Sequence, residues 1–512
     1  MDLTRRSLLG SVALAAGALA SPPRFELEEA TIDLLRKRMA EGSLTSQSLT
    51  KLYLERIAAI DKRGPELNAV IELNPDALAI AAALDKERKA KGARGPLHGL
   101  PVLIKDNIDT ADRMMTTAGS LALLGSMASR DSAVAERLRA AGAVLLGKTN
   151  LSEWANMRSS HSTSGWSGRG GQTRNPYALD RNPCGSSSGS GAAVSANLCV
   201  AAIGTETDGS IVCPSTTNGI VGIKPTLGLI PATGIIPIAH SQDTAGPMAR
   251  TVADAALLLG ALTGIDYSGS LDPKGLKGAR IGVARDKFFG FHEKTDQIME
   301  AAIQEVKRGG AEIVDPADVP NLDKYGDSES EVLLYEFKAD LSAYLGALGP
   351  KAPVHSMQEV IDFNERHRDR EMPYFGQDLM IKAQAKGPLT TQAYLDALEK
   401  NHRLSRTEGI DAVMNQYHLD ALIAPTGGPA WCTDLVNGDH GLGGCSSPAA
   451  VAGYPHITVP AGFVVGLPVG LSFFGTANSE RVLIKLAYAF EQATRHRKAP
   501  QFRASADLSG GL

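Results

Sequence analysis

The pattern that most constrains the fold is an amphipathic helix followed directly by a short apolar strand. Residues 132–150, SAVAERLRAAGAVLLGKTN, have this form, with helical periodicity first and an expected strand at Ala143–Leu146. Residues 25–62 are also expected to be helical. Further short strands are expected at Val102–Ile104 and within GARIGVARD, LDALIAPT and PHITVPAGF. Helices that alternate with strands in this way predict an α/β fold.

Three longer stretches complete the expected organisation of the chain. Residues 155–191 are rich in Gly, Ser and Asn and too long for an idle connection, which favours a functional loop region. The apolar run AAVSANLCVAAIG, residues 192–204, is expected to be a helix. Residues 290–410 are mostly helical and charged, as a cap or insertion would be. The 512 residues show no repeat and no clear linker, so we expect one α/β domain with a helical elaboration.

The N-terminus has the three parts of an export signal. Arg5 and Arg6 form a basic start, an apolar run covers residues 8–20, and the run ends on an Ala-Leu-Ala cleavage pattern. The paired arginines and the weakly apolar run predict a twin-arginine signal over residues 1–20. The run is shorter than the roughly 20 residues of a spanning helix, so no stable membrane anchor is expected. The predicted destination is the bacterial periplasm or the medium.

Charge and cysteine spacing argue against several classes of function. A net charge of −4 and 5% aromatic residues give no basic or stacking surface for nucleic acid. The five cysteines lack a C-x-x-C spacing, and no metal site is expected. Their odd number leaves at least one thiol unpaired, and the pairing stays open. Cys199 is interpreted as a small buried hydrophobic residue. The cysteines are Cys184, Cys199, Cys213, Cys432 and Cys445.

The stretch CGSSSGSGAA, residues 184–193, invites several interpretations. Its centre fits the G-x-S-x-G pattern of a nucleophile elbow at Ser187, which needs a strand leading into the serine. The preceding NPYALDRNPCG has two Asn-Pro pairs, which argue against a core strand. A phosphate-binding loop would need Gly-Lys-Ser/Thr, but Gly191 is followed by two alanines. The stretch leads into an Ala-rich helix, so its N–H groups are expected at a helix start.

Two further segments carry candidate catalytic side chains. Lys105 ends the apolar run of PVLIKD, where burial would disfavour its ammonium form. Ser210 follows the turn Asp208-Gly209 in TETDGSIVCPS, where free backbone N–H groups are expected beside its hydroxyl. A lysine with a lowered pKa is a known way to activate a serine without histidine.

In chain order, these segments resemble the amidase signature family. The resemblance rests on GLPVLIKDNID, GKTNLSEWAN, GGQTRNP, CGSSSGSGAA, TETDGSIVCPS and the C-terminal GYPHITVPAGF. It extends over about residues 25–500, with the signature core at about 95–265. It implies an α/β amidase signature fold, in which a large mixed β-sheet is flanked by helices in a single domain. The helical elaboration would then cover about residues 290–410.

The resemblance also implies a Ser–cis-Ser–Lys triad. Carried over by position, Lys105 is the base, Ser186 is a bridging serine in a cis peptide, and Ser210 is the nucleophile. The backbone N–H groups of residues 207–210 would form the oxyanion hole, and no metal or organic cofactor is implied. These four residues are Thr207, Asp208, Gly209 and Ser210.

Two departures from the family pattern bear on the substrate. Asp208 stands where most members have Gly, and Val212 stands where most have Arg, which points away from the glutamine-using transamidases. The export signal argues against transamidation too. TETDGSIVCP and GWSGRGGQTRNPY look most like the bacterial peptide amidases. We therefore expect an amidohydrolase that cleaves peptide C-terminal amides, or related primary amides, through an acyl-serine.

Two alternatives remain open. An aryl- or fatty-acyl amidase is one, although the sequence has no strongly apolar insertion that would favour it. A catalytically inactive amide-binding protein is the other, and the presence of all three triad positions argues against it. In each case the expected partner is a small-molecule or peptide amide.

Overall fold

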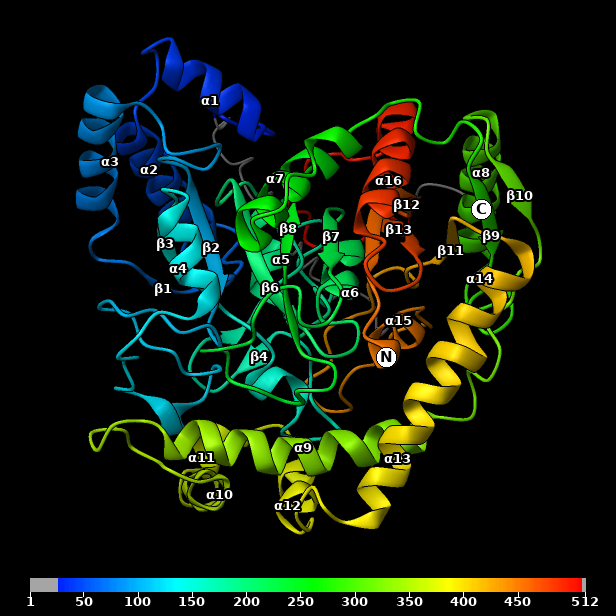
Figure 1. The fold of residues 1–512 in the computed structure, drawn as a ribbon. Coiled ribbons are helices and arrows are strands. Elements are labelled where there is room, and N and C mark those ends of the chain that lie inside the picture. The colour runs from blue at the N-terminus through cyan, green and yellow to red at the C-terminus, as the bar shows by residue number, and fades with distance from the viewer. Residues whose placement is uncertain (1–25, 509–512) are drawn as a thin grey trace, which may run out of the picture.

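The computed structural model describes residues 26–508 and is built on one large mixed sheet (Figure 1). The export signal predicted for residues 1–20 lies outside these residues. From edge to edge the sheet contains β1 (Val70–Leu73), β3 (Val144–Thr149), β2 (Pro101–Lys105), β6 (Ala201–Glu206), β8 (Thr244–Ala249), β7 (Val221–Lys224), β12 (His456–Val464), β13 (Leu467–Phe474), β11 (Ala421–Pro425), β9 (Arg280–Val283) and β10 (Glu312–Val314). A separate small sheet pairs β4 (Trp166–Ser167) with β5 (Gly171–Gln172).

Helices pack against this sheet and around its edges. They are α1 (Ile32–Ala40), α2 (Ser46–Arg56), α3 (Ala77–Lys91), α4 (Ala133–Ala140), α5 (Ser188–Ser195), α6 (Val212–Thr217), α7 (Val252–Thr263), α8 (Glu293–Arg308), α14 (Asp411–Tyr417), α15 (Ser447–Ala452) and α16 (Glu480–Thr494). Their ends follow ordinary capping chemistry. Thr251 caps α7, for example, by accepting a hydrogen bond from the N–H of Asp254.

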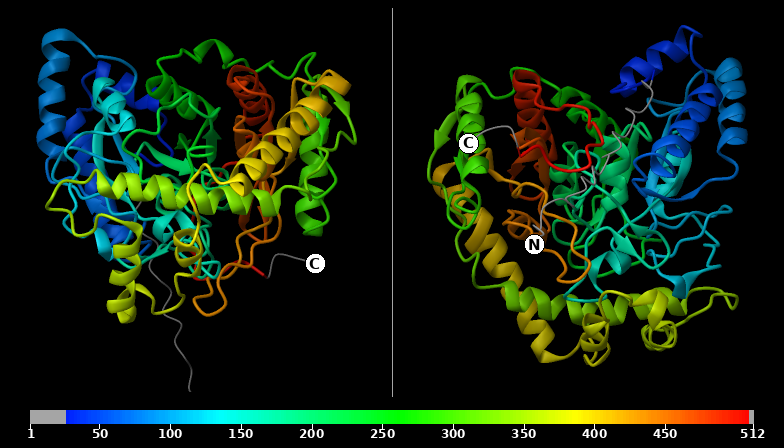
Figure 2. Two further views of the ribbon diagram at one scale, coloured as in Figure 1. Left: turned by 60° about the horizontal axis from the view of Figure 1, so that its bottom comes forward. Right: turned by 180° about the vertical axis from the view of Figure 1, so that it is seen from behind.

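Of the stretch 290–410 that was expected to be helical, α8 packs on the main sheet and β10 pairs within it. The helical elaboration consists of five α-helices that follow β10 in the chain. They are α9 (Gly326–Gly346), α10 (Met357–Arg366), α11 (Arg368–Glu371), α12 (Asp378–Gln384) and α13 (Gln392–His402). The long helix α9 runs across the bottom of the molecule in Figure 1, and the views of Figure 2 show the same helices gathered along that side. Its apolar side chains, Phe337 and Leu341 among them, pack with Trp154 and Ile236 in a second core cluster.

The register of the central strands fixes where the site lies. Strand β2 pairs in parallel with both β3 and β6, so the C-terminal ends of β2 and β6 meet at one edge of the sheet. Every residue of β2 and β6 is buried, as expected for strands covered on both faces. The edge therefore carries Lys105 at the end of β2 and Glu206 at the end of β6.

The predicted strands are confirmed, with one correction nearby. The strand expected at Val102–Ile104 is β2, and that expected at Ala143–Leu146 is β3, shifted by one residue and longer. The helix expected over residues 192–204 is wrong in its second half. Helix α5 ends at Ser195, Asn197 turns the chain with φ 58°, and residues 201–204 form the first part of β6. A short buried apolar run does not distinguish a helix from a strand.

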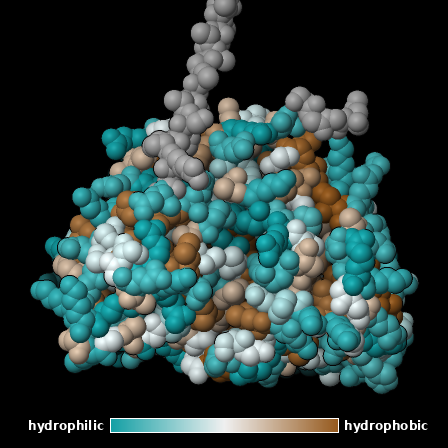
Figure 3. All heavy atoms as spheres, turned by 90° about the horizontal axis from the view of Figure 1, so that it is seen from above, coloured by the Kyte–Doolittle hydropathy of each residue, from teal (hydrophilic) through white to brown (hydrophobic). Residues whose placement is uncertain are grey.

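The surface shows little concentration of apolar groups from the side drawn in Figure 3, where hydrophilic side chains surround scattered hydrophobic ones. Within residues 26–508, no helix is long and apolar enough to cross a membrane.

Candidate active site

Lys105 is completely buried, and its amine faces two hydroxyls. Its Nζ donates to Ser186 Oγ at 2.7 Å and to Thr205 Oγ1 at 2.8 Å. Burial lowers the pKa of Lys105 to about 7, although the carboxylates of Asp243 and Glu206 act in the opposite direction. A large fraction of this lysine is therefore neutral near pH 7, and a neutral amine can accept a proton.

Ser186 lies in the turn that leads into α5. The Gly185–Ser186 peptide bond is cis, as the resemblance predicts, and the Ser186 side chain is buried. The carbonyl of Ser186 accepts a hydrogen bond from the N–H of Ser152 at 3.1 Å. The next residue, Ser187, donates its N–H to the carbonyl of Ser210 at 3.2 Å. This backbone contact brings the two serine-bearing segments together.

Ser210 lies in a five-residue loop, Thr207–Ile211, between β6 and α6. Gly209 has φ 79°, a left-handed conformation that a side chain would strain. A Cβ there would also lie 3.0 Å from Ser446 Oγ. No described residue accepts a hydrogen bond from the N–H groups of residues 207–210. Ser210 itself is 7% exposed, so the nucleophile candidate is within reach of solvent.

Glu206 anchors this loop from within the same segment. Its Oε2 accepts hydrogen bonds from the N–H groups of Ile211 and Val212, at 2.7 and 3.0 Å, at the start of α6. Burial raises the pKa of Glu206, against the opposite effect of Lys224 and of these two N–H groups. Glu206 was not among the site residues predicted from the sequence. The signal was present, because an acidic residue shortly before a helix commonly accepts hydrogen bonds from the first N–H groups.

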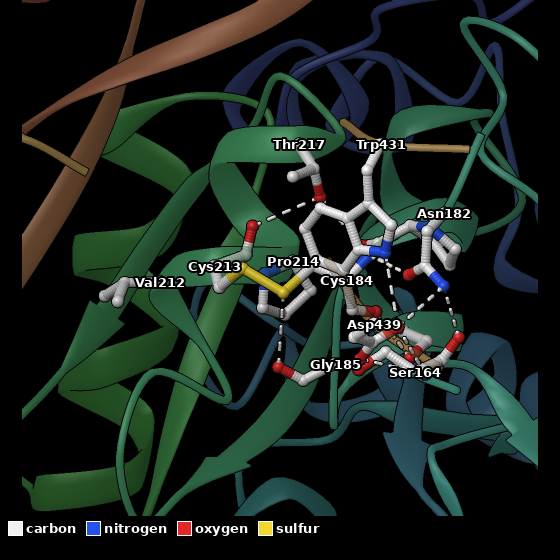
Figure 4. The surroundings of a disulfide bond; sticks show 12 residues. Ser164, Asn182, Cys184, Gly185, Val212, Cys213, Pro214, Thr217, Trp431 and Asp439 are labelled. Atoms are coloured by element: carbon white, nitrogen blue, oxygen red, sulfur yellow. Dashed lines mark hydrogen bonds between the residues drawn. A yellow bond between two sulfur atoms is a disulfide. The ribbon is translucent and has the colours of Figure 1, made fainter. Parts of the chain in front are cut away.

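A disulfide between Cys184 and Cys213 joins the two serine segments (Figure 4). Cys184 lies two residues before Ser186, and Cys213 lies three residues after Ser210, so the bond spans both candidate serines. Cys199 and Cys445 are buried free thiols and Cys432 is an exposed one. The interpretation of Cys199 as a buried small residue is thus confirmed. The pairing that the sequence left open is decided by the approach of these two turns.

The Ser187 interpretation fits the structure poorly. Ser187 Oγ is fully buried and donates to the carbonyl of Thr205 at 3.0 Å, while it accepts the N–H of Thr205 at 3.2 Å. Ser187 therefore ties the start of α5 to strand β6. A strand does not lead into this serine, since no strand lies between β5 and α5. The G-x-S-x-G match lacks the context of a nucleophile elbow.

One group of side chains among the described residues has the spacing of a metal site. The ligand atoms of His240, Glu336 and Asp340 lie within 4.8 Å of one another. Both ring nitrogens of His240 face a carboxylate, with Nδ1 2.8 Å from Asp340 Oδ2 and Nε2 3.4 Å from Glu336 Oε1. The hydrogen bond with Asp340 raises the pKa of His240. The ring of His240 therefore bridges two carboxylates of α9.

Known proteins similar to this chain are amidases and amidotransferase subunits. The family model described as Amidase matches residues 48–484. A probable amidase of Arabidopsis thaliana is 43% identical over 505 residues, which cover 94% of this chain and 93% of the relative. A glutamyl-tRNA(Gln) amidotransferase chain of Pseudomonas syringae is 34% identical, with 93% of this chain and all of that one covered. The native peptide amidase from Stenotrophomonas maltophilia, a solved structure, is 51% identical in sequence and has a TM-score of 0.90. The match covers 94% of this chain and 100% of that chain.

Proposed function

The chain belongs to the amidase family and is a hydrolase of C–N amide bonds, and from this premise we propose that it cleaves peptide C-terminal amides through a Ser–cis-Ser–Lys triad. The observation that carries the triad is the 2.7 Å contact between the buried amine of Lys105 and Ser186 Oγ. The backbone contact between Ser187 and Ser210 supports the third member.

In this scheme the proton moves along the three side chains. Neutral Lys105 accepts a proton from Ser186 while Ser186 accepts the proton of Ser210. Ser210 Oγ then forms a bond to the amide carbon, and the carbonyl electrons move to its oxygen. When the C–N bond breaks, Ser186 returns a proton to the leaving nitrogen and Lys105 returns one to Ser186. Water attacks the acyl-serine by the same proton path and releases the acid.

The negative oxygen formed in this step needs donors that are already in place. The N–H groups of residues 207–210 have no acceptor among the described residues and stand beside Ser210. Removing one such donor from an oxyanion hole typically costs about 10²–10³ in kcat. This loop is therefore the proposed oxyanion hole.

The proposed substrate class draws on the relatives. A peptide amidase is 51% identical over nearly the whole chain, and a peptide amidase has been solved with the competitive inhibitor chymostatin. The amidotransferase relatives are more distant, at 34% identity, and this chain carries Asp208 and Val212 in the loop region. Both facts favour a peptide or small primary amide over glutamine.

The test is release of ammonia from a panel of primary amides, and of aniline from an anilide, by protein that begins at residue 26. We expect turnover of a peptide C-terminal amide, weaker turnover of an anilide and of a fatty-acyl amide, and none of glutamine. Ser210→Ala should abolish turnover while leaving the folded state intact. Preferred turnover of the anilide or of the fatty-acyl amide would favour those alternatives. Absence of turnover on every amide, with retained amide binding, would favour the inactive binding protein.

We also propose export to the periplasm or medium by the twin-arginine signal of residues 1–20. The Cys184–Cys213 disulfide supports this, since such bonds persist in oxidising compartments. Fractionation of a bacterial host that expresses the full chain, compared with Arg5→Lys/Arg6→Lys, tests it. Equal amounts of both forms outside the cytoplasm would contradict the proposal.

A further inference from the structure

Helix α9 presents three acidic side chains along one face to residues 240–242, a tripeptide that contacts the proposed oxyanion loop. Glu329, Glu336 and Asp340 are seven and four residues apart, a spacing that keeps them on one side of a helix. Each accepts a hydrogen bond from a different member of the tripeptide 240–242. The bonds run from Gln242 Nε2 to Glu329 Oε1 at 3.0 Å, from Ser241 N to Glu336 Oε2 at 2.9 Å, and from His240 N to Asp340 Oδ2 at 3.0 Å.

The third residue of this tripeptide reaches the nucleophile loop. Gln242 is 2% exposed, and its Nε2 also donates to the carbonyl oxygen of Thr207 at 3.3 Å. A side-chain amide carries two N–H bonds, so the contacts with Thr207 and Glu329 use both. Glu329 and the carbonyl of Thr207 thus fix the side-chain amide of Gln242 between them. Glu329 also faces the side chain of Asp208 in the same loop, and burial together with this neighbouring carboxylate raises the pKa of Glu329.

A neighbouring residue holds the same point of the loop through its side chain. Thr207 Oγ1 donates to Asp243 Oδ1 at 2.6 Å. Asp243 Oδ2 accepts the N–H groups of Ile238 and Ala239, at 2.7 and 2.9 Å, so its carboxylate is fixed in turn. Thr207 is therefore held at two groups: its carbonyl is bonded by Gln242 and its hydroxyl by Asp243.

The carbonyl contact determines where a neighbouring N–H points. In a trans peptide the C=O and the following N–H lie in one plane and point in opposite directions. The cis bonds of the described chain are Gly185–Ser186 and Asp315–Pro316, so the Thr207–Asp208 peptide is trans. A hydrogen bond that holds Thr207 O on one side of the loop therefore directs the N–H of Asp208 to the other side.

We propose that Gln242 is a positioning residue for the oxyanion hole, and that helix α9 takes part in catalysis by fixing Gln242 through Glu329. The inference rests on the proposed function, because it requires the N–H of Asp208 to stabilise the oxyanion. Gln242 itself touches no reacting atom. Its loss should weaken binding of the transition state and leave binding of the ground-state amide unchanged.

The control is a second buried glutamine in the helical elaboration. Gln377 is 5% exposed, and its Nε2 donates to the carbonyl of Ile361 at 3.1 Å. Its Oε1 accepts Asn364 Nδ2 at 3.1 Å. Its chemistry thus matches that of Gln242, but its partners have no contact with the nucleophile loop. Gln377→Leu reports what the loss of a buried amide does to this region in general.

The experiment compares Gln242→Leu with Gln377→Leu by kcat and KM on a peptide amide. It also measures inhibition by a peptidyl trifluoromethyl ketone, whose carbonyl becomes an oxyanion when a serine adds to it. For Gln242→Leu we expect kcat to fall about 10- to 100-fold, less than the loss of a whole donor. The ketone should lose affinity by a similar factor, with KM within about twofold of wild type. Gln377→Leu should keep wild-type kcat and ketone affinity.

A folded Gln242→Leu with wild-type kcat, or an equal loss of kcat in Gln377→Leu, would overturn the proposal. If Gln242→Leu does not fold, Glu329→Leu and Glu329→Gln replace it. We expect Glu329→Leu to lower kcat about 2- to 5-fold only, because the hydrogen bond from Gln242 to the carbonyl of Thr207 remains. Glu329→Gln should restore kcat, because its amide oxygen can accept the hydrogen bond from Gln242 Nε2. Wild-type kcat in Glu329→Leu would overturn the role of α9. Turnover by Ser210→Ala would instead refute the proposed function itself.

Discussion

The two serine-bearing segments of the site are held in different ways. The Ser186 segment belongs to the core: α5 is buried along its whole length, and Ser188 Oγ bonds the carbonyl of Cys184 four residues earlier. The Ser210 loop is held by Glu206 and by the bond from the N–H of Ser187 to the carbonyl of Ser210, and otherwise by residues far away in the chain. Gln242 holds its backbone, and Ser447 of α15 donates to Asp208 Oδ2 at 2.6 Å.

The sheet core and the elements outside it therefore position different parts of the proposed site. The bridging serine takes its position from α5, from the central strands and from the N–H of Ser152. The oxyanion loop takes its position from a loop and a helix outside the sheet. The helical elaboration is therefore connected to the proposed site through 240–242.

The largest loss of kcat is expected when Lys105 or Ser186, the two fully buried members of the proposed triad, is replaced. Lys105→Met and Ser186→Ala should each lower kcat by about 10³-fold or more, because both remove a member of the proposed triad. Ser187→Ala is the matched control in the same turn. It should cost about 1–3 kcal/mol of stability, since the N–H of Thr205 loses its acceptor, while kcat changes far less. Steady-state kinetics and urea denaturation measure the two. A Lys105→Met enzyme with wild-type kcat would refute the path.

The next effect is expected at the local anchor of the oxyanion loop. Glu206→Leu removes the acceptor of the Ile211 and Val212 N–H groups, and we expect about 3 kcal/mol of lost stability with a roughly 10- to 100-fold lower kcat. Glu206→Gln keeps an acceptor oxygen and should lie between this variant and wild type. Ser188→Ala probes the other segment and should change stability by about 1 kcal/mol. Equal kcat for Glu206→Leu and Ser188→Ala would contradict the claim that Glu206 positions the oxyanion loop.

The Cys184–Cys213 disulfide connects the Ser186 segment to the Ser210 segment. Its cysteines are 29 residues apart, so the chain-entropy estimate for the double variant Cys184→Ser/Cys213→Ser is a loss of about 3–4 kcal/mol. Urea denaturation with and without reductant measures this loss, and reductant should have no further effect on the double variant. Cys432→Ser removes an exposed free thiol and should leave stability unchanged. A double variant as stable as wild type would show that packing alone holds the two turns together.

The smallest expected effect is that of pH. The pKa of Lys105 lies at about 7 because the amine is buried, and only the neutral amine accepts a proton. As pH falls through 7 the neutral fraction decreases, so kcat/KM should fall about tenfold between pH 8 and pH 6. Circular dichroism over the same range separates this titration from unfolding. A flat profile between pH 6 and pH 8 in a folded enzyme would contradict the role of Lys105 as base.

The local parts of the site could be predicted from the sequence. Lys105 at the end of a strand, the serine-rich turn before a helix, and the glycine before Ser210 are all features of a few neighbouring residues. Such features follow from backbone preferences and from the burial of apolar runs, which act over short distances. The α/β fold and most central strands were predictable for the same reason.

Only the tertiary structure decided the rest. Residues 201–206 became a strand because β2 and β8 are available to pair with them, a fact that the apolar run does not carry. The pairing of Cys184 with Cys213 depends on two turns that approach each other in space. The contacts of Gln242 with Thr207 and Glu329 span 35 and 87 residues. Local patterns report what a segment prefers, whereas these partners are set by how the whole sheet and its helices pack.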